Sequence, residues 1–323
     1  MNAAADIQLT RRPLVRVGGA CFSVLAVTVC VLVAQRLSTT SWPLGGTRPH
    51  LVLAAAGAYF ASFVLRALGW QRLFPVAERP DRSRCLAACG AAAASGVILP
   101  FRLDYVVKVS TLRRLGGVRV GLEAIGLSIV ALGLVDAVAM LPLTTAALVT
   151  SGAVFRAPLI AVLLFCVGCV GVLVAGQRLV HLPLIARCER LESICQRVGE
   201  HTAWRATFSA GTFLLGCWLL RGTGNTLLLV AFGVGFSPTL ALVVLCMAAA
   251  ASILPITAGG ALVSIGATSG VLVGLGVSGP HAVNFSLSAG LLLTSCALIA
   301  ALIGVAGSLV HTLLRRHEPV PVT

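Results

Sequence analysis

Two charged side chains lie deep within apolar stretches of the sequence. Asp136 comes about 15 residues after the start of one such stretch, near Gly121, and Arg221 about 14 residues after the start of another, near Thr207. A charge at the bilayer centre costs about 2.5–3.5 kcal/mol on insertion scales, so both residues are functional candidates. Both stretches are expected to run from the cytosol outward, and a rise of about 1.5 Å per residue gives the two charges similar depths. An ion pair between them is therefore allowed; the alternative is that each meets water or the headgroups separately.

A second polar group follows Pro100 and consists of Arg102, Asp104, Tyr105 and Lys108. A helix broken by proline leaves backbone groups free to meet a polar ligand. The Arg and the Lys suit a lipid phosphate at the inner entrance of a site. The structural alternative is that both cations anchor the segment at the headgroups while Asp104 pairs with them.

A third group follows Pro255 and carries hydroxyls and exposed backbone but no charge. Thr257, Gly259 and Gly260 suit a neutral gate or a close helix contact as much as a binding site. Motifs of soluble enzymes, such as G-x-x-x-x-G-K-[ST] and H-E-x-x-H, do not occur in the sequence. The pair Cys166 and Cys169 lies in an apolar run, where packing is the expected role. We therefore predict a protein that is not an enzyme and needs no cofactor or metal.

Composition identifies the surroundings in which these residues must act. The 323-residue chain is 58% hydrophobic and 11% charged, with a mean hydropathy of +1.00, far more apolar than a soluble domain. Runs near the length of about 20 residues that crosses a bilayer predict six spanning helices. The first is interpreted as a retained helix and not a signal peptide. The runs cover residues 17–34, 51–65, 122–149, 158–176, 207–236 and 281–314.

The basic residues indicate topology. The net charge of +14 is dealt out between the apolar runs and does not form one patch, which argues against nucleic acid as a partner. Placing the N-terminus in the cytosol puts 20 of the 24 basic residues inside. We predict a multi-pass protein of the cytoplasmic membrane, a single domain over residues 1–323, with both termini cytosolic and a cytosolic connector at about 177–205.

Two apolar segments are broken by proline and glycine, at about 85–115 and 237–278. Both contain Ile-Leu-Pro, at residues 98–100 and 253–255, separated by 155 residues. Basic flanks place the first on the cytosolic side, and the lengths of the neighbouring spans place the second on the outer side. The sequence predicts two re-entrant helical hairpins in an inverted repeat, an all-α polytopic fold. The alternatives are that the shared tripeptide is a coincidence and that the chain is a bundle of eight transmembrane helices.

The order of several short motifs resembles the lysylphosphatidylglycerol synthase transmembrane family, whose members form flippase-like membrane domains that are sometimes fused to a soluble synthase. Nearly the whole chain is covered, and this chain is expected to carry no synthase domain. It departs from the family pattern at Asp104-Tyr105, Ala131-Leu132 and Ser264-Ile265, where charged family residues are replaced. The motifs are Gly69-Trp70-Gln71-Arg72, Ile98-Leu99-Pro100-Phe101-Arg102, Leu134-Val135-Asp136 and Leu254-Pro255-Ile256-Thr257-Ala258-Gly259-Gly260.

The resemblance implies a flippase-like protein that moves or binds an anionic or glycan-linked membrane lipid. Arg102, Asp104 and Lys108 would lie at the inner entrance, with Asp136 and Arg221 deeper. The alternative is a non-catalytic membrane subunit that assists a separate cell-envelope or lipid-modifying enzyme. An integral-membrane transferase is a third hypothesis, which is less favoured because the sequence offers no clear catalytic acid or base.

Overall fold

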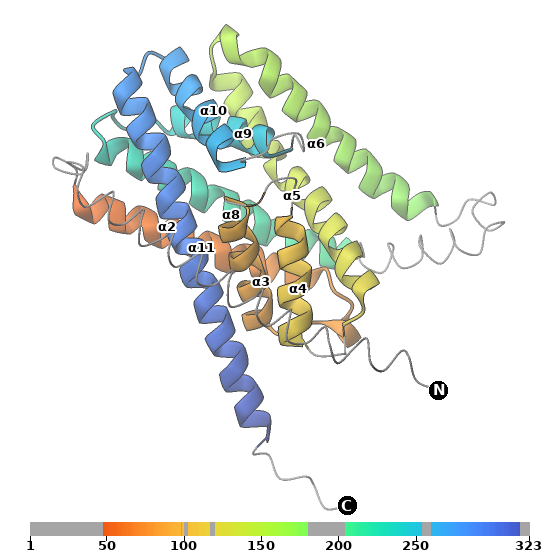
Figure 1. The fold of residues 1–323 in the computed structure, drawn as a ribbon. Helices are drawn as coiled ribbons and strands as arrows, with labels where there is room; N and C mark the ends of the chain where they lie inside the picture. Colours follow the sequence, from red (N-terminus) through yellow and green to blue (C-terminus); the bar gives the residue numbers. More distant parts are fainter. Residues whose placement is uncertain are drawn as a thin grey trace, which may run out of the picture. The chain divides into compact units, whose positions relative to one another are not determined.

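The computed structural model describes residues 48–97, 99, 103–116, 120–179, 204–253 and 260–316, and these residues belong to one compact unit. They are helical almost throughout, which confirms the predicted all-α class. Figure 1 shows the arrangement. The long helices are α2 (Pro49–Arg72), α5 (Leu122–Thr150), α6 (Ala153–Leu179), α8 (Trp204–Ala231) and α11 (Gly279–Arg316), and the shorter ones are α3 (Arg82–Ser95), α4 (Asp104–Gly116), α9 (Pro238–Ile253) and α10 (Gly260–Gly274).

Within the described residues, five helices are long and apolar enough to cross a membrane: α2, α5, α6, α8 and α11. Each coincides with a run that the sequence predicted, while the first predicted span and most of the connector at 177–205 lie outside the described residues. Large apolar side chains also point away from the protein interior, among them Leu164 and Phe165 on α6 and Leu302 on α11. Such surfaces are stable in lipid and costly in water. The chain is therefore a polytopic membrane protein.

The two proline-containing segments each form a pair of short helices. α3 and α4 contain 14 and 13 residues, and α9 and α10 contain 16 and 15. At about 1.5 Å per residue none of them exceeds about 24 Å, which is less than the hydrocarbon thickness of about 30 Å. In each pair the two helices pack against each other. Neither segment is thus one straight spanning helix, although Pro100 and residues 254–259 lie outside the described residues.

The helices recur at nearly constant spacing along the chain. α2 and α8 begin 155 residues apart, at 49 and 204, and α3 and α9 begin 156 apart, at 82 and 238. α4 and α10 also begin 156 apart, at 104 and 260, and α5 and α11 begin 157 apart, at 122 and 279. This order matches the 155-residue spacing of the two Ile-Leu-Pro strings. Apart from α6, the long and short α-helices of the described chain therefore form two halves with the same succession of elements.

The neighbours of the helices repeat as well. α2 packs on α3 and α11, and its equivalent α8 packs on the equivalents α9 and α5; likewise α3 packs on α11, and α9 on α5. The contacts of α4 with α5 correspond to those of α10 with α11. The contacts of α2 with α5 correspond to those of α8 with α11, while α6 packs on α5 and α9 and has no counterpart among the described residues. Two halves that share both order and neighbours are related by an approximate two-fold axis.

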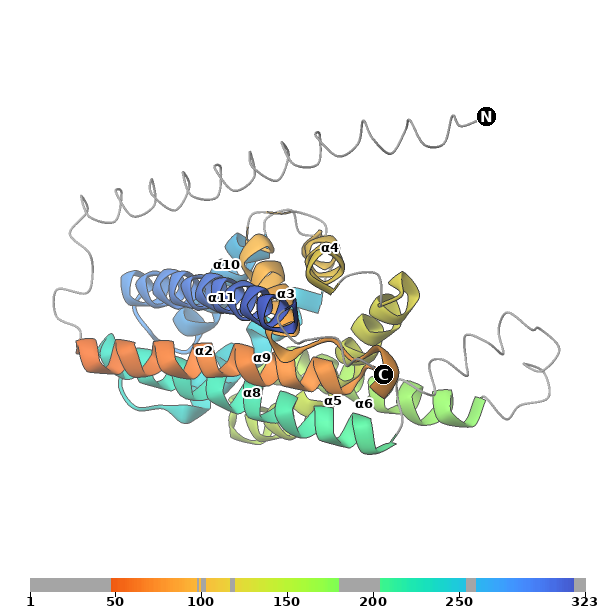
Figure 2. The same cartoon turned by 90° about the horizontal axis from the view of Figure 1, so that it is seen from below.

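The axis passes between α2 and α8, which run side by side in opposite directions (Figure 2). The Tyr59 hydroxyl donates to Asn225 Oδ1 at 2.5 Å, and further along α2 a Cβ built on Gly69 would lie 3.2 Å from Leu214 Cγ. Because the residue numbers of the contacts increase along α2 while they decrease along α8, the two helices pack antiparallel. Equivalent helices of opposite direction are what an inverted repeat requires.

Small residues let α3 and α11 approach closely. A Cβ built on Gly90 would lie 2.5 Å from the carbonyl oxygen of Ala297 and 2.5 Å from the amide nitrogen of Ala301. One built on Gly304 would lie 2.6 Å from the carbonyl oxygen of Ser83. Helices in lipid associate through van der Waals packing, and small residues allow that packing to be close. The first hairpin is thus held firmly against the last helix.

Candidate functional site

Asp136 lies where α2, α5 and α8 meet. Its Oδ2 accepts a hydrogen bond from Arg66 Nη2 on α2 at 2.7 Å, which is also an ion pair, and its Oδ1 accepts one from Trp218 Nε1 on α8 at 2.8 Å. Only 12% of the Asp136 side chain and 24% of the Arg66 side chain are exposed. Both carboxylate oxygens therefore hold charge-assisted hydrogen bonds in a site with little solvent.

The ion pair that the sequence allowed between Asp136 and Arg221 is not found among the described residues. Arg221 instead donates from Nε to Ser62 Oγ at 3.4 Å, and its guanidinium carbon lies 5.4 Å from the ring centre of Phe63 and 5.2 Å from that of Trp218. Trp218 thus stands between the two groups, with its N–H on the carboxylate and its ring beside the guanidinium. The similar depth of Asp136 and Arg221 did not decide their pairing, because Arg66 on the neighbouring helix reaches the carboxylate first.

Lys108 extends the cluster toward the first hairpin. Its side chain is buried, with 5% of the residue exposed, and Nζ lies 4.0 Å from the ring centre of Trp70, one helical turn after Arg66. The same ring donates from Nε1 to Ser128 Oγ at 3.0 Å, which fixes its plane. Burial disfavours a charge at this position, while the quadrupole of the Trp70 ring favours the cation.

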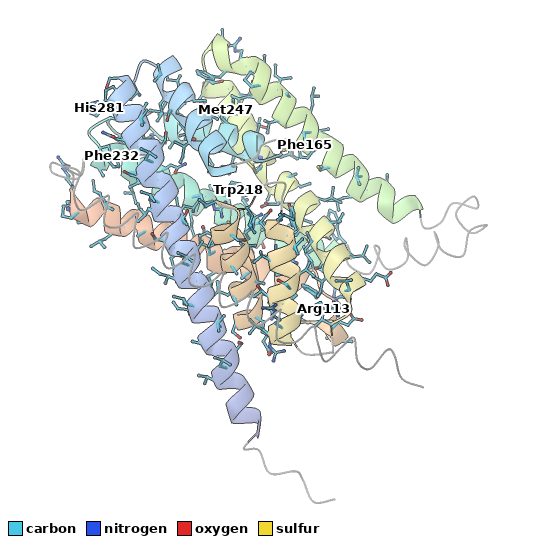
Figure 3. The ribbon with its side chains drawn as sticks, in the orientation of Figure 1. Arg113, Phe165, Trp218, Phe232, Met247 and His281 are labelled. Carbon is cyan, nitrogen blue, oxygen red and sulfur yellow. The ribbon has the colours of Figure 1, made fainter. Side chains whose placement is uncertain are left out.

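These contacts form a row of charges and aromatic rings. Trp218, one of its members, is labelled near the centre of the described helices in Figure 3. Three cations, Arg66, Lys108 and Arg221, accompany one carboxylate, Asp136. The row therefore holds more positive than negative charge in a setting where charges are costly. Because its positive charge is in excess, such an arrangement can bind an anion.

The other predicted site residues are placed less centrally or not at all. Asp104 begins α4 and is partly buried, while Tyr105 is 38% exposed and points outward. Gly260 begins α10. Arg102, Thr257 and Gly259 lie outside the described residues. The structure thus brings Lys108, Asp136 and Arg221 together in one row, while Tyr105 is exposed.

Sequence reasoning missed Arg66, which was counted with the cytosolic basic residues because the predicted apolar run ends at residue 65. In the structure α2 continues to Arg72, so Arg66 lies within the helix. A signal for it exists in the sequence. Leu65-Arg66-Ala67-Leu68-Gly69 and Leu220-Arg221-Gly222-Thr223-Gly224 share L-R-x-x-G at a spacing of 155 residues. Arg66 and Arg221 are therefore equivalent positions of the two halves.

The packing around the arginines is equivalent too. A Cβ built on Gly69 would approach Leu214, and one built on Gly224 would lie 2.8 Å from Tyr59 Cε1; both the glycines and their two contacts are 155 residues apart. Phe63 and Trp218, whose rings lie beside Arg221, are separated by the same number of residues. The two-fold relation thus holds at the level of single side chains.

The described part of the chain contains potential metal ligands and thiols. No group of three or more His, Cys, Asp or Glu side chains there is arranged to hold a metal ion. Cys166 and Cys169 are buried free cysteines on α6. They pack in the protein interior, as their apolar surroundings in the sequence indicated.

Comparison of the chain with known proteins gives one informative result. Characterised proteins and solved structures yield no significant match. A family described as the lysylphosphatidylglycerol synthase TM region matches residues 16–301, which is most of the chain and includes every element of the charged row. The protein therefore belongs to the family of the lysylphosphatidylglycerol synthase transmembrane region, as its motifs indicated.

Proposed function

We propose that this protein binds an anionic or glycan-linked lipid and moves it between the leaflets of the cytoplasmic membrane. The observation that supports the proposal is the row of three cations and one carboxylate at the junction of the two halves. Lipid headgroups carry phosphate, which arginine and lysine bind through charge-assisted hydrogen bonds. A cationic row between spanning helices offers such a headgroup a polar position away from the membrane surface.

The repeat supports movement as well as binding. In transporters built from inverted repeats, short broken helices from each half approach the binding site, and exposure alternates between the two sides of the membrane. Here α3 and α4 belong to one half and α9 and α10 to the other. Lys108 on α4 joins the first hairpin directly to the row. The two hairpins are thus the elements that would open the row to one leaflet or the other.

The proposal is tested by translocation of fluorescent lipids in proteoliposomes. Purified protein is reconstituted with a trace of headgroup-labelled or tail-labelled phosphatidylglycerol, and dithionite added outside reports the fraction that stays protected. We expect protein-dependent loss of protection that Arg221→Gln reduces strongly. Arg113→Gln is the matched control, because Arg113 is an exposed arginine near the end of α4 and outside the row.

The same preparation separates this function from that of an accessory subunit. Two results together would replace the proposal with the accessory-subunit hypothesis. No tested lipid would show protein-dependent translocation, and a pull-down from native membranes would recover one stoichiometric partner. In that case Asp136→Asn and Arg221→Leu would also leave the partner's activity unchanged.

The proposed topology has a direct test. With both termini cytosolic, a fluorescent reporter that folds only in the cytosol should be bright at either end of the chain, and a periplasmic enzyme reporter should be inactive there. Reporters placed near Ser151, between α5 and α6, should behave in the opposite way. Equal behaviour at all three positions would contradict the topology.

A further inference from the structure

The two equivalent arginines have different surroundings. Arg66 is neutralised by Asp136 at 2.7 Å, whereas Arg221 has a serine hydroxyl and two aromatic rings as its neighbours. Among the described residues no carboxylate forms an ion pair with Arg221. Two positions that share a common sequence pattern have thus acquired different charge balances.

The repeat identifies the residue that causes the different charge balance around Arg66 and Arg221. The equivalent of Asp136 lies 155–157 residues later, and those three positions are Leu291, Leu292 and Leu293. The contacts select Leu293. Gly90 approaches Ala301 in one half, and Cys246 approaches Thr144 at 3.9 Å in the other, so Thr144 on α5 and Ala301 on α11 are equivalent and lie 157 residues apart. Leu293 thus stands where the second half would carry a carboxylate for Arg221.

The orientation of Arg221 fits an external anion. Its guanidinium carbon lies over the rings of Phe63 and Trp218, and its Nε donates to Ser62 Oγ. The donors on both terminal nitrogens lie in the plane of the guanidinium and bond to no other described side chain. A guanidinium whose Nε already has a partner keeps the two-pronged edge formed by its terminal nitrogens, which matches the oxygens of phosphate.

We infer that Arg221 is the phosphate-binding residue of this protein, that a phosphate oxyanion takes the place of the carboxylate that Leu293 does not supply, and that Arg66 is a structural residue neutralised by Asp136. The inference rests on the proposed function and gives it a ligand class, the phosphodiester of a membrane lipid. Free inorganic phosphate shares this chemistry and is a separate arm of the test.

The decisive variant is Leu293→Asp, which restores the missing carboxylate. The measurement is the shift in melting temperature of the detergent-solubilised full chain on titration with phosphatidylglycerol, phosphatidylcholine, a galactosyl diacylglycerol without phosphate, or inorganic phosphate. We expect stabilisation by both phospholipids and none by the galactolipid. Leu293→Asp and Arg221→Gln should weaken the apparent affinity by about tenfold to a hundredfold. Two control variants should retain the apparent affinity. They are Leu293→Asn, whose new side chain has the size of Asp but no charge, and Arg113→Gln.

Each outcome bears on the inference. Unchanged phospholipid affinity in Arg221→Gln overturns it, and this variant decides the question if Leu293→Asp does not fold. Stabilisation by inorganic phosphate at the same site, lost in Arg221→Gln, supports the phosphate site but assigns it to a free anion. Phospholipid binding without translocation supports the inference and refutes the proposed movement. Translocation that persists in Arg221→Gln refutes the inference but supports the proposed lipid movement.

Discussion

Replacing Asp136 by Asn should destabilise the protein through Arg66. The carboxylate of Asp136 accepts from Arg66 at 2.7 Å and from Trp218 at 2.8 Å. An amide keeps one accepting oxygen and loses the charge, so Arg66 is left without its counter-ion between α2 and α5. Removing one partner of a buried ion pair costs about 3–5 kcal/mol.

The partial exposure of the pair reduces this value. Because 24% of the Arg66 side chain and 12% of the Asp136 side chain remain accessible, some of the lost interaction is replaced by solvent or headgroups. We expect the free energy of unfolding to fall by about 2–3 kcal/mol. Equilibrium unfolding in mixed micelles, followed by far-UV circular dichroism as dodecyl sulfate is titrated, measures the change.

Double-mutant cycles identify which arginine is responsible. Asp136→Asn is combined with Arg66→Gln in one cycle and with Arg221→Gln in the other. The first cycle should give a coupling energy of about 1–2 kcal/mol, and the second a smaller one, because Trp218 separates Arg221 from the carboxylate. A larger coupling with Arg221 than with Arg66 would show that the ion pair has been assigned to the wrong arginine.

Two further predictions concern packing. Trp218→Phe removes the N–H that donates to Asp136 but keeps a ring beside Arg221, and should lower the unfolding free energy by about 1–2 kcal/mol in the same titration; no change would mean that this hydrogen bond adds nothing. Gly304→Ala places a methyl group 2.6 Å from the carbonyl oxygen of Ser83 and should cost about 1–3 kcal/mol by separating α3 from α11, seen as a lower melting temperature in detergent. Gly266→Ala, which has open space around the added Cβ, should have little effect; equal losses in both variants would contradict the packing argument.

The spanning helices could be predicted from the sequence because the bilayer acts on each helix separately. A run such as 122–149 must satisfy its backbone internally and present apolar side chains, whatever its neighbours are. The structure has α5 at Leu122–Thr150. The division of each hairpin segment into two short helices was predicted from its proline and glycine residues, because proline removes a helical hydrogen bond. Proline alone does not decide a break, since Pro142 and Pro158 lie inside α5 and α6.

The partners of charged residues could not be predicted in the same way. Arg66 was counted as cytosolic because it follows the end of a predicted apolar run, and Arg221 was considered as a partner of Asp136 because the two have similar depths. Depth along a helix is a one-dimensional quantity, whereas pairing depends on which helices are adjacent and which faces they present. The antiparallel packing of α2 and α8 supplies that information.

The sequence by itself determined that the chain is helical, crosses a membrane several times, contains two broken segments spaced 155 residues apart and belongs to its family. Only the tertiary structure decided that Asp136 neutralises Arg66 and that Arg221 is left beside two aromatic rings. The physical reason is the range of the forces involved. Transfer into lipid and helix formation act on neighbouring residues, while an ion pair needs two side chains within about 4 Å that the chain separates by 70 residues.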